Sequence, residues 1–183
     1  MADFYSSMKL LKRLEFSNPK NCLHKNATED EITYFGIYKK ANPKWSGWQV
    51  IDETLQSLSI SEASKSLYEN EWLTSKVYQF YLDNFWHKLK LDKIDSQKIA
   101  DEIFCFGCNA GIKTAIKLAQ KALNLDDDGI IGENTLNALN SCDESEFDLA
   151  FDDLEMEYYD KLIAKNPKLA IYQKGWYNRA KAV

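Results

Sequence analysis

The hydrophobic residues of this chain recur mostly at helical spacing, and this pattern limits the fold more than any other feature. After Phe4, the apolar residues Met8 and Leu11 follow at intervals of four and three residues. Glu15 comes four residues after Leu11, so it lies on the same stripe of a first helix. Runs that alternate apolar and polar residues are few, and we therefore expect a mainly α protein.

A polar segment interrupts the helical pattern early. Pro19 and the polar run 18–31 end the first helix and predict a long irregular segment or a small hairpin. Segment 32–38 predicts a short strand, because it combines β-branched and aromatic residues. A turn-rich stretch, 42–48, follows, and we expect helices to resume near Ser61.

The second half of the chain predicts a series of further helices. Ser96 is a candidate N-cap for the first of them, and the Asn166-Pro167 pair stops the last. We expect an N-terminal part, 1–95, and a helical C-terminal part, 96–183, packed closely on it. The expected helices of the second part cover residues 96–106, 112–123, 133–140 and 147–166.

The stretch 124–131 imitates the start of a calcium-binding EF-hand loop, with oxygen donors at alternate positions and a glycine at the sixth. Its twelfth position is Thr135, which cannot supply the bidentate carboxylate of such loops. We therefore expect a tight turn in which Gly129 and Gly132 adopt backbone shapes that other residues resist, with Asp128 bonding nearby amides.

Composition fits a soluble globular protein with a real core, since 45% of the 183 residues are hydrophobic and 28% are charged. The net charge of -5 and the absence of a basic stripe indicate no nucleic-acid partner. No apolar run is long enough to span a bilayer, and the N-terminus lacks a signal-peptide pattern. We expect a monomer without stable membrane insertion, synthesised in the cytoplasm.

Cysteine and histidine usage predicts neither redox nor metal chemistry. Cys105 and Cys108 have C-x-x-C spacing, but no βαβ pattern surrounds them and no second pair completes a zinc site. We expect inert thiols. Neither His24 nor His87 has neighbours of metal-ligand type, so we predict no catalytic metal and no cofactor.

Glu15 has a setting that suits a general acid. An acid that protonates a glycosidic oxygen near neutral pH needs a raised pKa, and apolar neighbours such as Leu11, Leu14 and Phe16 provide the necessary desolvation. The polar loop that follows offers room for a sugar. Taken alone, however, an ordinary glutamate at a helix end with its carboxylate in water accounts for the same pattern.

A set of motifs in a fixed order resembles a known family. Leu14-Glu15, the Asn18-Pro19 turn and the stretch 33–37 resemble the N-terminal signature of glycoside hydrolase family 108, whose members are N-acetylmuramidases. The second half resembles the predicted peptidoglycan-binding domain that accompanies this family and the family's closing motif. Phe85-Trp86 resembles the family's Tyr-Trp pair, the likeness to the domain rests on 109–111, 119–123, 128–132 and Thr135, and the likeness to the closing motif rests on 175–179.

The resemblance implies a lysozyme-like α+β fold and hydrolysis of the β-1,4 bond between N-acetylmuramic acid and N-acetylglucosamine, with Glu15 as proton donor. The family's Asp-x-Gly-Gly element is missing, and Phe16 and Ser17 stand where the family has two glycines. The resemblance to the family therefore does not identify the second catalytic group in this sequence. We favour Glu29 or Glu31 for it, with Thr33 orienting the water.

Substrate contacts are expected near these acids. His24 and Asn26 lie in the same loop, and aromatic side chains pack well against sugar faces, so we expect sugar contacts from Tyr34, Trp45 and Trp48. Each of these proposed roles has a simpler alternative. The acids would only solvate a loop, His24 would be structural, and the aromatic rings would pack in the core. Core packing is the interpretation we favour for Trp72, Trp86 and Trp176.

Two other functions stay open. One is a non-catalytic peptidoglycan-binding or phage-tail structural module whose altered loop has lost activity. The other is a lytic transglycosylase, which needs the acid but neither a second carboxylate nor a water. In each case peptidoglycan strands are the expected partner, reached in the periplasmic or external cell wall after export, injection or release through a holin.

Overall fold

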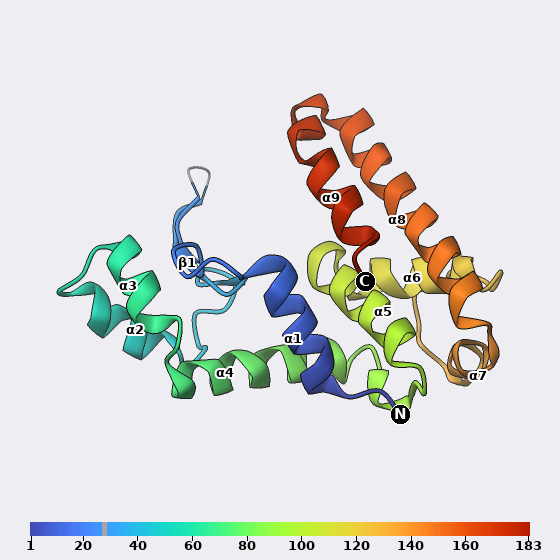
Figure 1. Cartoon of the computed structure of the whole chain (residues 1–183), viewed down its shortest axis with the longest axis horizontal. Helices are drawn as coiled ribbons and strands as arrows, with labels where there is room; N and C mark the ends of the chain where they lie inside the picture. The colour runs from blue at the N-terminus through green and yellow to red at the C-terminus, as the bar shows by residue number, and fades with distance from the viewer. Residues whose placement is uncertain (27–28) are drawn as a thin grey trace. The chain divides into compact units, whose positions relative to one another are not determined.

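The computed structural model describes residues 1–26 and 29–183, and helices predominate in this part of the chain (Figure 1). A small antiparallel sheet follows the first helix, which confirms the predicted mainly α fold with a hairpin region. The α-helices are α1 (Phe4–Glu15), α2 (Trp48–Leu55), α3 (Ile60–Leu67), α4 (Glu71–Tyr81), α5 (Gln97–Ala110), α6 (Ile112–Ala122), α7 (Glu133–Ser141), α8 (Glu144–Lys165) and α9 (Gln173–Ala180).

The remaining elements are short. They are the strands β1 (Leu23–His24), β2 (Thr33–Tyr34) and β3 (Ile37–Tyr38), the π-helix η1 (Leu82–Trp86) and the 3-10 helices η2 (Leu91–Lys93) and η3 (Pro167–Tyr172). Within the described ranges, every helix is too short or too polar to traverse a lipid bilayer.

The chain forms two compact units. Residues 11–82 make up one, here called the small unit, and residues 1–10 together with 83–183 make up the other, the large unit. The boundaries of these units differ from the boundary at residue 95 that separates the expected parts 1–95 and 96–183.

Aromatic packing explains why residues before 96 join the large unit. The ring centroid of Trp86 lies 5.6 Å from that of Phe4 and 5.7 Å from that of Phe104, both in edge-on contacts. Trp86 is 2% exposed, so this cluster belongs to the core of the large unit. The first residues of the chain and the start of its second half are thereby held in one body.

The sheet of the small unit corrects the predicted strand over 32–38. The segment forms two strands of two residues each, β2 and β3, joined at Phe35 and Gly36, and β2 also pairs with β1. Phe35 has φ +43° and Gly36 has φ +75°, which is the combination that a type I′ hairpin turn requires.

Phe35 is a large residue in the left-handed region, which is uncommon and costs free energy. Hydrogen bonds fix the Phe35 backbone on both sides. The Phe35 N–H donates to the Cys22 carbonyl at 2.7 Å, and the Tyr81 hydroxyl donates to the Phe35 carbonyl at 2.9 Å. Its ring lies 5.1 Å from that of Phe16 and stacks on Tyr68 at 5.7 Å. The surrounding contacts therefore hold the strained turn.

Helices resume earlier than predicted. α2 begins at Trp48, directly after the turn-rich stretch, whereas α3 begins at Ile60, next to the predicted Ser61. Trp48 and Ile51 are buried and anchor α2 in the small unit. Residue 47 is a glycine, which has no side chain to form the capping hydrogen bond that marks many helix starts.

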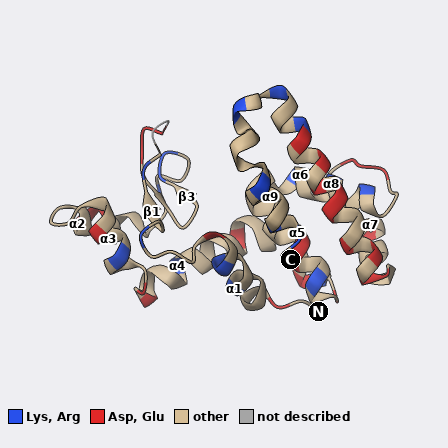
Figure 2. Ribbon diagram, turned by 45° about the horizontal axis from the view of Figure 1, so that its top comes forward, with Lys and Arg blue, Asp and Glu red and all other residues tan. Residues whose placement is uncertain are grey.

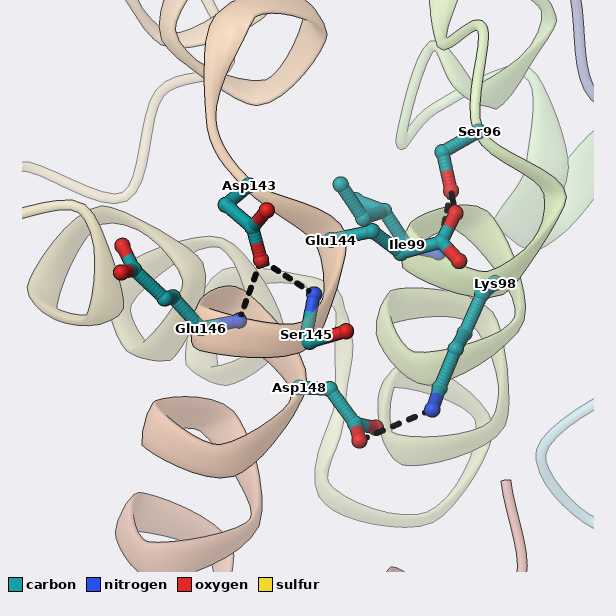
Figure 3. A network of polar contacts seen from close by, with 8 residues as sticks. All are labelled: Ser96, Lys98, Ile99, Asp143, Glu144, Ser145, Glu146 and Asp148. Atoms are coloured by element: carbon teal, nitrogen blue, oxygen red, sulfur yellow. Dashed lines mark hydrogen bonds and ion pairs between the residues drawn. The ribbon is translucent and has the colours of Figure 1, made fainter.

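Helices α5, α6 and α7 of the large unit begin as predicted, whereas α8 begins at Glu144, three residues before the expected start at 147, and α9 was not predicted. Ser96 caps α5, because its hydroxyl accepts from the Ile99 N–H at 3.1 Å. Asp143 caps α8 by accepting from the N–H groups of Ser145 and Glu146, as Figure 3 shows. The core between α5 and α8 is aromatic and includes Phe106 and Phe151, both at most 1% exposed.

Candidate active site

Glu15 is the last residue of α1, and its side chain is half-buried. Leu11, one turn earlier, is 1% exposed, so the apolar stripe of the helix leads up to the glutamate. The next residue, Phe16, contacts the ring of Phe35 in the hairpin turn, and its carbonyl accepts from the Tyr68 hydroxyl at 3.1 Å. These contacts fix the chain directly after Glu15 against the sheet of the small unit.

His24 and Thr33 face each other across the sheet, as the register of β1 and β2 pairs them. Nδ1 of His24 lies 2.9 Å from the carbonyl oxygen of Asn21. A carbonyl only accepts, so Nδ1 carries the proton and Nε2 is the acceptor of the neutral ring. The histidine is thus held with one nitrogen ready to accept a hydrogen bond.

Glu29 lies in the same network. Its Oε2 accepts from Asn26 Nδ2 at 2.9 Å and from Thr33 Oγ1 at 3.4 Å. Its carboxylate is half-buried, and its backbone N–H also donates to the Asn26 carbonyl at 3.0 Å. The structure therefore brings together Asn26, Glu29 and Thr33, with His24 opposite Thr33 on the neighbouring strand.

The other acids of this loop lie differently. Glu31 is exposed, and Asp30 forms a surface ion pair with Lys40 at 2.5 Å. Of the two carboxylates predicted for the second catalytic role, only Glu29 has recorded donors that orient it among the described residues. An oriented carboxylate in the loop between two paired strands is the kind of group that positions a water molecule.

The three aromatic candidates pack on one another. Tyr34 is 0% exposed; its hydroxyl donates to the Leu67 carbonyl at 2.8 Å, and its ring stacks with Trp45 at 6.1 Å. Trp48 is 4% exposed and lies 5.0 Å from Trp45, edge to face. In this structure the rings of Tyr34 and Trp48 support the sheet from within, and Trp45, which is half-buried, has the most surface left for a sugar. Their contacts with substrate stay predictions.

Among the other tryptophans, the core interpretation is wrong for Trp72. Its side chain is 46% exposed, and the Lys76 ammonium lies 5.2 Å from its ring. Trp86 is buried as expected.

The sequence analysis missed a cluster of acids in the large unit. Glu102 of α5 is 1% exposed, and it offers a carboxylate oxygen within 4.8 Å of oxygens from Asp148 and Asp152 of α8. Glu155, one turn further along α8, is 4% exposed. Figure 3 shows the ion pair between Lys98 and Asp148 beside this cluster, at 2.8 Å. The sequence spacing could have predicted the burial of Glu102, because this residue lies three residues after Ile99 and four before Phe106, on the buried face of its helix.

Burial raises the pKa of these acids. Desolvation, followed by a hydrogen bond with Asp148, raises the pKa of Glu102 to about 10. Desolvation also raises the pKa of Glu155 to about 8 and that of Asp152 to about 6. Two carboxylates bond to each other only when one carries a proton, so Glu102 is the protonated donor to Asp148 at neutral pH. Ionised, its oxygens would be buried without a donor. Three oxygens at this spacing also suit a cation, but the proton on Glu102 and the ion pair of Asp148 with Lys98 already offset part of the negative charge.

A solved structure titled "Structure of Brucella abortus SagA" is similar to this chain, with a TM-score of 0.65 and 19% sequence identity. The match covers 97% of this chain and 89% of that chain. At this identity the likeness supports the fold alone. A comparison with curated proteins found no match.

Two family models match the chain in succession. Residues 24–111 match the model described as Glycosyl hydrolase 108, which includes His24, Asn26, Glu29, Glu31 and Thr33 and begins after Glu15. Residues 114–181 match the model described as Predicted Peptidoglycan domain. The chain thus joins a segment similar to a glycosyl hydrolase family with a segment similar to a peptidoglycan domain.

Proposed function

We propose that this protein is a peptidoglycan hydrolase of the N-acetylmuramidase type. It cleaves the β-1,4 bond between N-acetylmuramic acid and N-acetylglucosamine. The observation that carries the proposal is the oriented carboxylate of Glu29, held by Asn26 and Thr33 inside the region that matches the glycosyl hydrolase model. The match of the second region to a peptidoglycan domain supports the choice of substrate.

In the proposed reaction Glu15 donates a proton to the leaving glycosidic oxygen. Glu29 accepts a proton from a water molecule that attacks the anomeric carbon, and Thr33 keeps the Glu29 carboxylate in place. The C–O bond of the glycoside breaks as the water oxygen bonds to carbon, so one water is consumed for each bond cleaved. His24, Asn26 and Trp45 are the proposed sugar contacts.

The test is the clearing of a peptidoglycan suspension by the wild-type protein and by Glu15→Gln and Glu29→Gln. We expect both variants to lose at least about 100-fold in rate while keeping their fold, because each removes a proton-transfer group. Glu31→Gln is the matched control and should retain activity, since Glu31 is exposed. Equal failure of wild type and variants to clear the suspension would favour the non-catalytic binding module.

Mass spectrometry of the released fragments separates hydrolysis from lytic transglycosylation. Hydrolysis leaves reducing N-acetylmuramic acid ends, whereas a transglycosylase leaves 1,6-anhydro ends and consumes no water. Because the substrate lies in the cell wall, we also propose that the protein acts in the periplasm or outside the cell, after export, injection or release through a holin.

A further inference from the structure

A cavity of about 340 Å³ lies between α6 and α8 of the large unit. Its apolar lining includes Leu118 of α6 and Leu154 and Tyr158 of α8, and we call it the α6–α8 groove. This volume is at the lower end of the range for small-ligand sites. The lining of the groove shares no residue with the acid cluster of Glu102.

Lysines surround the groove. Lys113, Lys117 and Lys121 follow one another at intervals of four residues, so they lie along one face of α6, and Lys161 approaches from α8. The protein as a whole carries a charge of -5, and acidic residues recur along α8 (Figure 2). A basic groove on an acidic protein selects an anion by local contacts rather than by long-range attraction.

Two of these lysines are already paired. Lys121 binds Asp127 at 3.2 Å, and Lys161 binds Glu157 at 2.7 Å. Within the described residues, no acidic oxygen lies at ion-pair distance, 4.0 Å or less, from Lys113 or Lys117. These two ammonium groups are therefore the ones available to an anionic ligand.

The loop 126–132 fixes the stems of both lysines. A Cβ atom at Gly129 would lie 2.9 Å from Cγ of Lys113 and 3.4 Å from Cε of Lys117, so the glycine backbone packs directly on them. Gly129 has φ +76°, as predicted, whereas Gly132 has φ -98°, which other residues adopt easily, so that part of the prediction is wrong. The turn that imitates a calcium loop thus positions two lysines.

Gln120 clamps this turn from the core. It is 2% exposed, its Nε2 donates to Asp128 Oδ1 at 2.7 Å and to the Ile130 carbonyl at 3.1 Å, and its Oε1 accepts from the Gly129 N–H at 2.9 Å. Asp128 also accepts from the Ile130 N–H at 2.8 Å, as the sequence predicts. A buried, satisfied network of this kind gives the groove a rigid basic wall.

We propose that the α6–α8 groove binds a carboxylate of the peptide stem of peptidoglycan. This inference rests on the proposed function, because peptidoglycan supplies the ligand. Stem peptides combine free carboxylates with small apolar side chains such as the alanine methyl group. That combination matches two available ammonium groups above a floor of leucine and tyrosine. The residues from 114 onward that line the groove lie in the region similar to the peptidoglycan domain.

The test is calorimetric titration with a muramoyl-tetrapeptide whose carboxyl groups are free, and with the same compound after amidation. We expect the wild-type protein to prefer the free form by about tenfold, which is the effect of about one charge-assisted contact. The double variant Lys113→Ala/Lys117→Ala should lose this preference and keep its helical circular dichroism, because alanine favours helix. Lys88→Ala, which removes an exposed lysine outside the groove, is the control and should bind like the wild type.

Equal binding of the free and amidated compounds, or full binding by the double variant, would overturn the proposal. So would equal binding of inorganic phosphate at the same concentration, since the groove would then accept any anion. Cleavage of peptide-free glycan strands tests the proposed function separately. A protein that binds the tetrapeptide but cleaves no glycan refutes the function alone, and one that cleaves without preferring the free carboxylates refutes the groove alone.

Discussion

The carboxyl group of Glu102 on α5 lies against that of Asp148 on α8, inside the core of the large unit. Lys98 neutralises Asp148 from one side, while the positive charges of Arg179 and Lys181 act on Glu155 and Asp152. The pair is stable because Glu102 keeps its proton.

The first prediction concerns pH and stability. The raised pKa values of about 10 for Glu102, 8 for Glu155 and 6 for Asp152 exceed the ordinary values of 4.5 and 3.8. The folded state therefore holds more protons than the unfolded state between pH 5 and pH 8, and stability falls as pH rises. We expect the free energy of unfolding in urea to be several kcal/mol lower at pH 8 than at pH 5, since each extra proton held by the folded state contributes about 1.4 kcal/mol per pH unit.

Glu102→Gln tests the origin of this slope. The amide has nearly the same shape, has no charge to bury and still donates to Asp148, so the variant should be more stable than wild type at pH 8 and depend less on pH. Glu157→Gln serves as the control, because this residue is exposed. An unchanged slope in Glu102→Gln would show that another group is responsible.

Gly36→Ala should destabilise the small unit. The substitution places a Cβ atom 2.6 Å from the Tyr81 hydroxyl, at a residue with φ +75°. We expect a loss of about 1 to 3 kcal/mol, measured by thermal unfolding. Gly175→Ala provides the contrast, since its added Cβ would meet no other described part of the chain within 4 Å beyond its own helix turn, and helix α9 favours alanine. Equal stability of the two variants would contradict the strained turn.

Thr33→Val should lower the rate of peptidoglycan cleavage by about tenfold, with little change in KM. Valine keeps the branched shape of β2 but cannot donate to Glu29 Oε2. The matched control is Thr54→Val, which removes a hydroxyl that bonds only within helix α2. If both variants lose the same activity, the effect comes from stability and not from the orientation of Glu29.

Gln120→Ala should cost about 2 to 4 kcal/mol of stability, because it leaves the buried turn 126–132 without its clamp. It should also weaken tetrapeptide binding, since the turn supports Lys113 and Lys117. Gln49→Ala, at an exposed glutamine of α2, should affect neither measurement. A normal affinity in Gln120→Ala would mean that the lysines hold their positions without the turn.

Periodicity predicted most helices of this fold, since burial of one face at helical spacing dominates their stability. It failed at α2, where the helix starts at Trp48 without a capping side chain. Periodicity also predicted a single strand where the structure has β2 and β3, because phenylalanine is not a residue type that indicates a left-handed turn. In the candidate site, Asn26, Glu29 and Thr33 are among the residues that the sequence indicated, but it predicted neither the hydrogen bonds that join them nor the full burial of Tyr34. Side-chain burial in a loop depends on contacts far along the chain.

The large unit is built from two stretches of chain, residues 1–10 and 83–183, with the small unit inserted between them. During synthesis from the ribosome, Phe4 emerges early, but its ring partners Trp86 and Phe104 emerge only after the whole of the small unit has been made. A fragment that begins at residue 83 would lack the buried side chains of Phe4 and Met8, so we expect it to be less stable than the large unit of the intact protein.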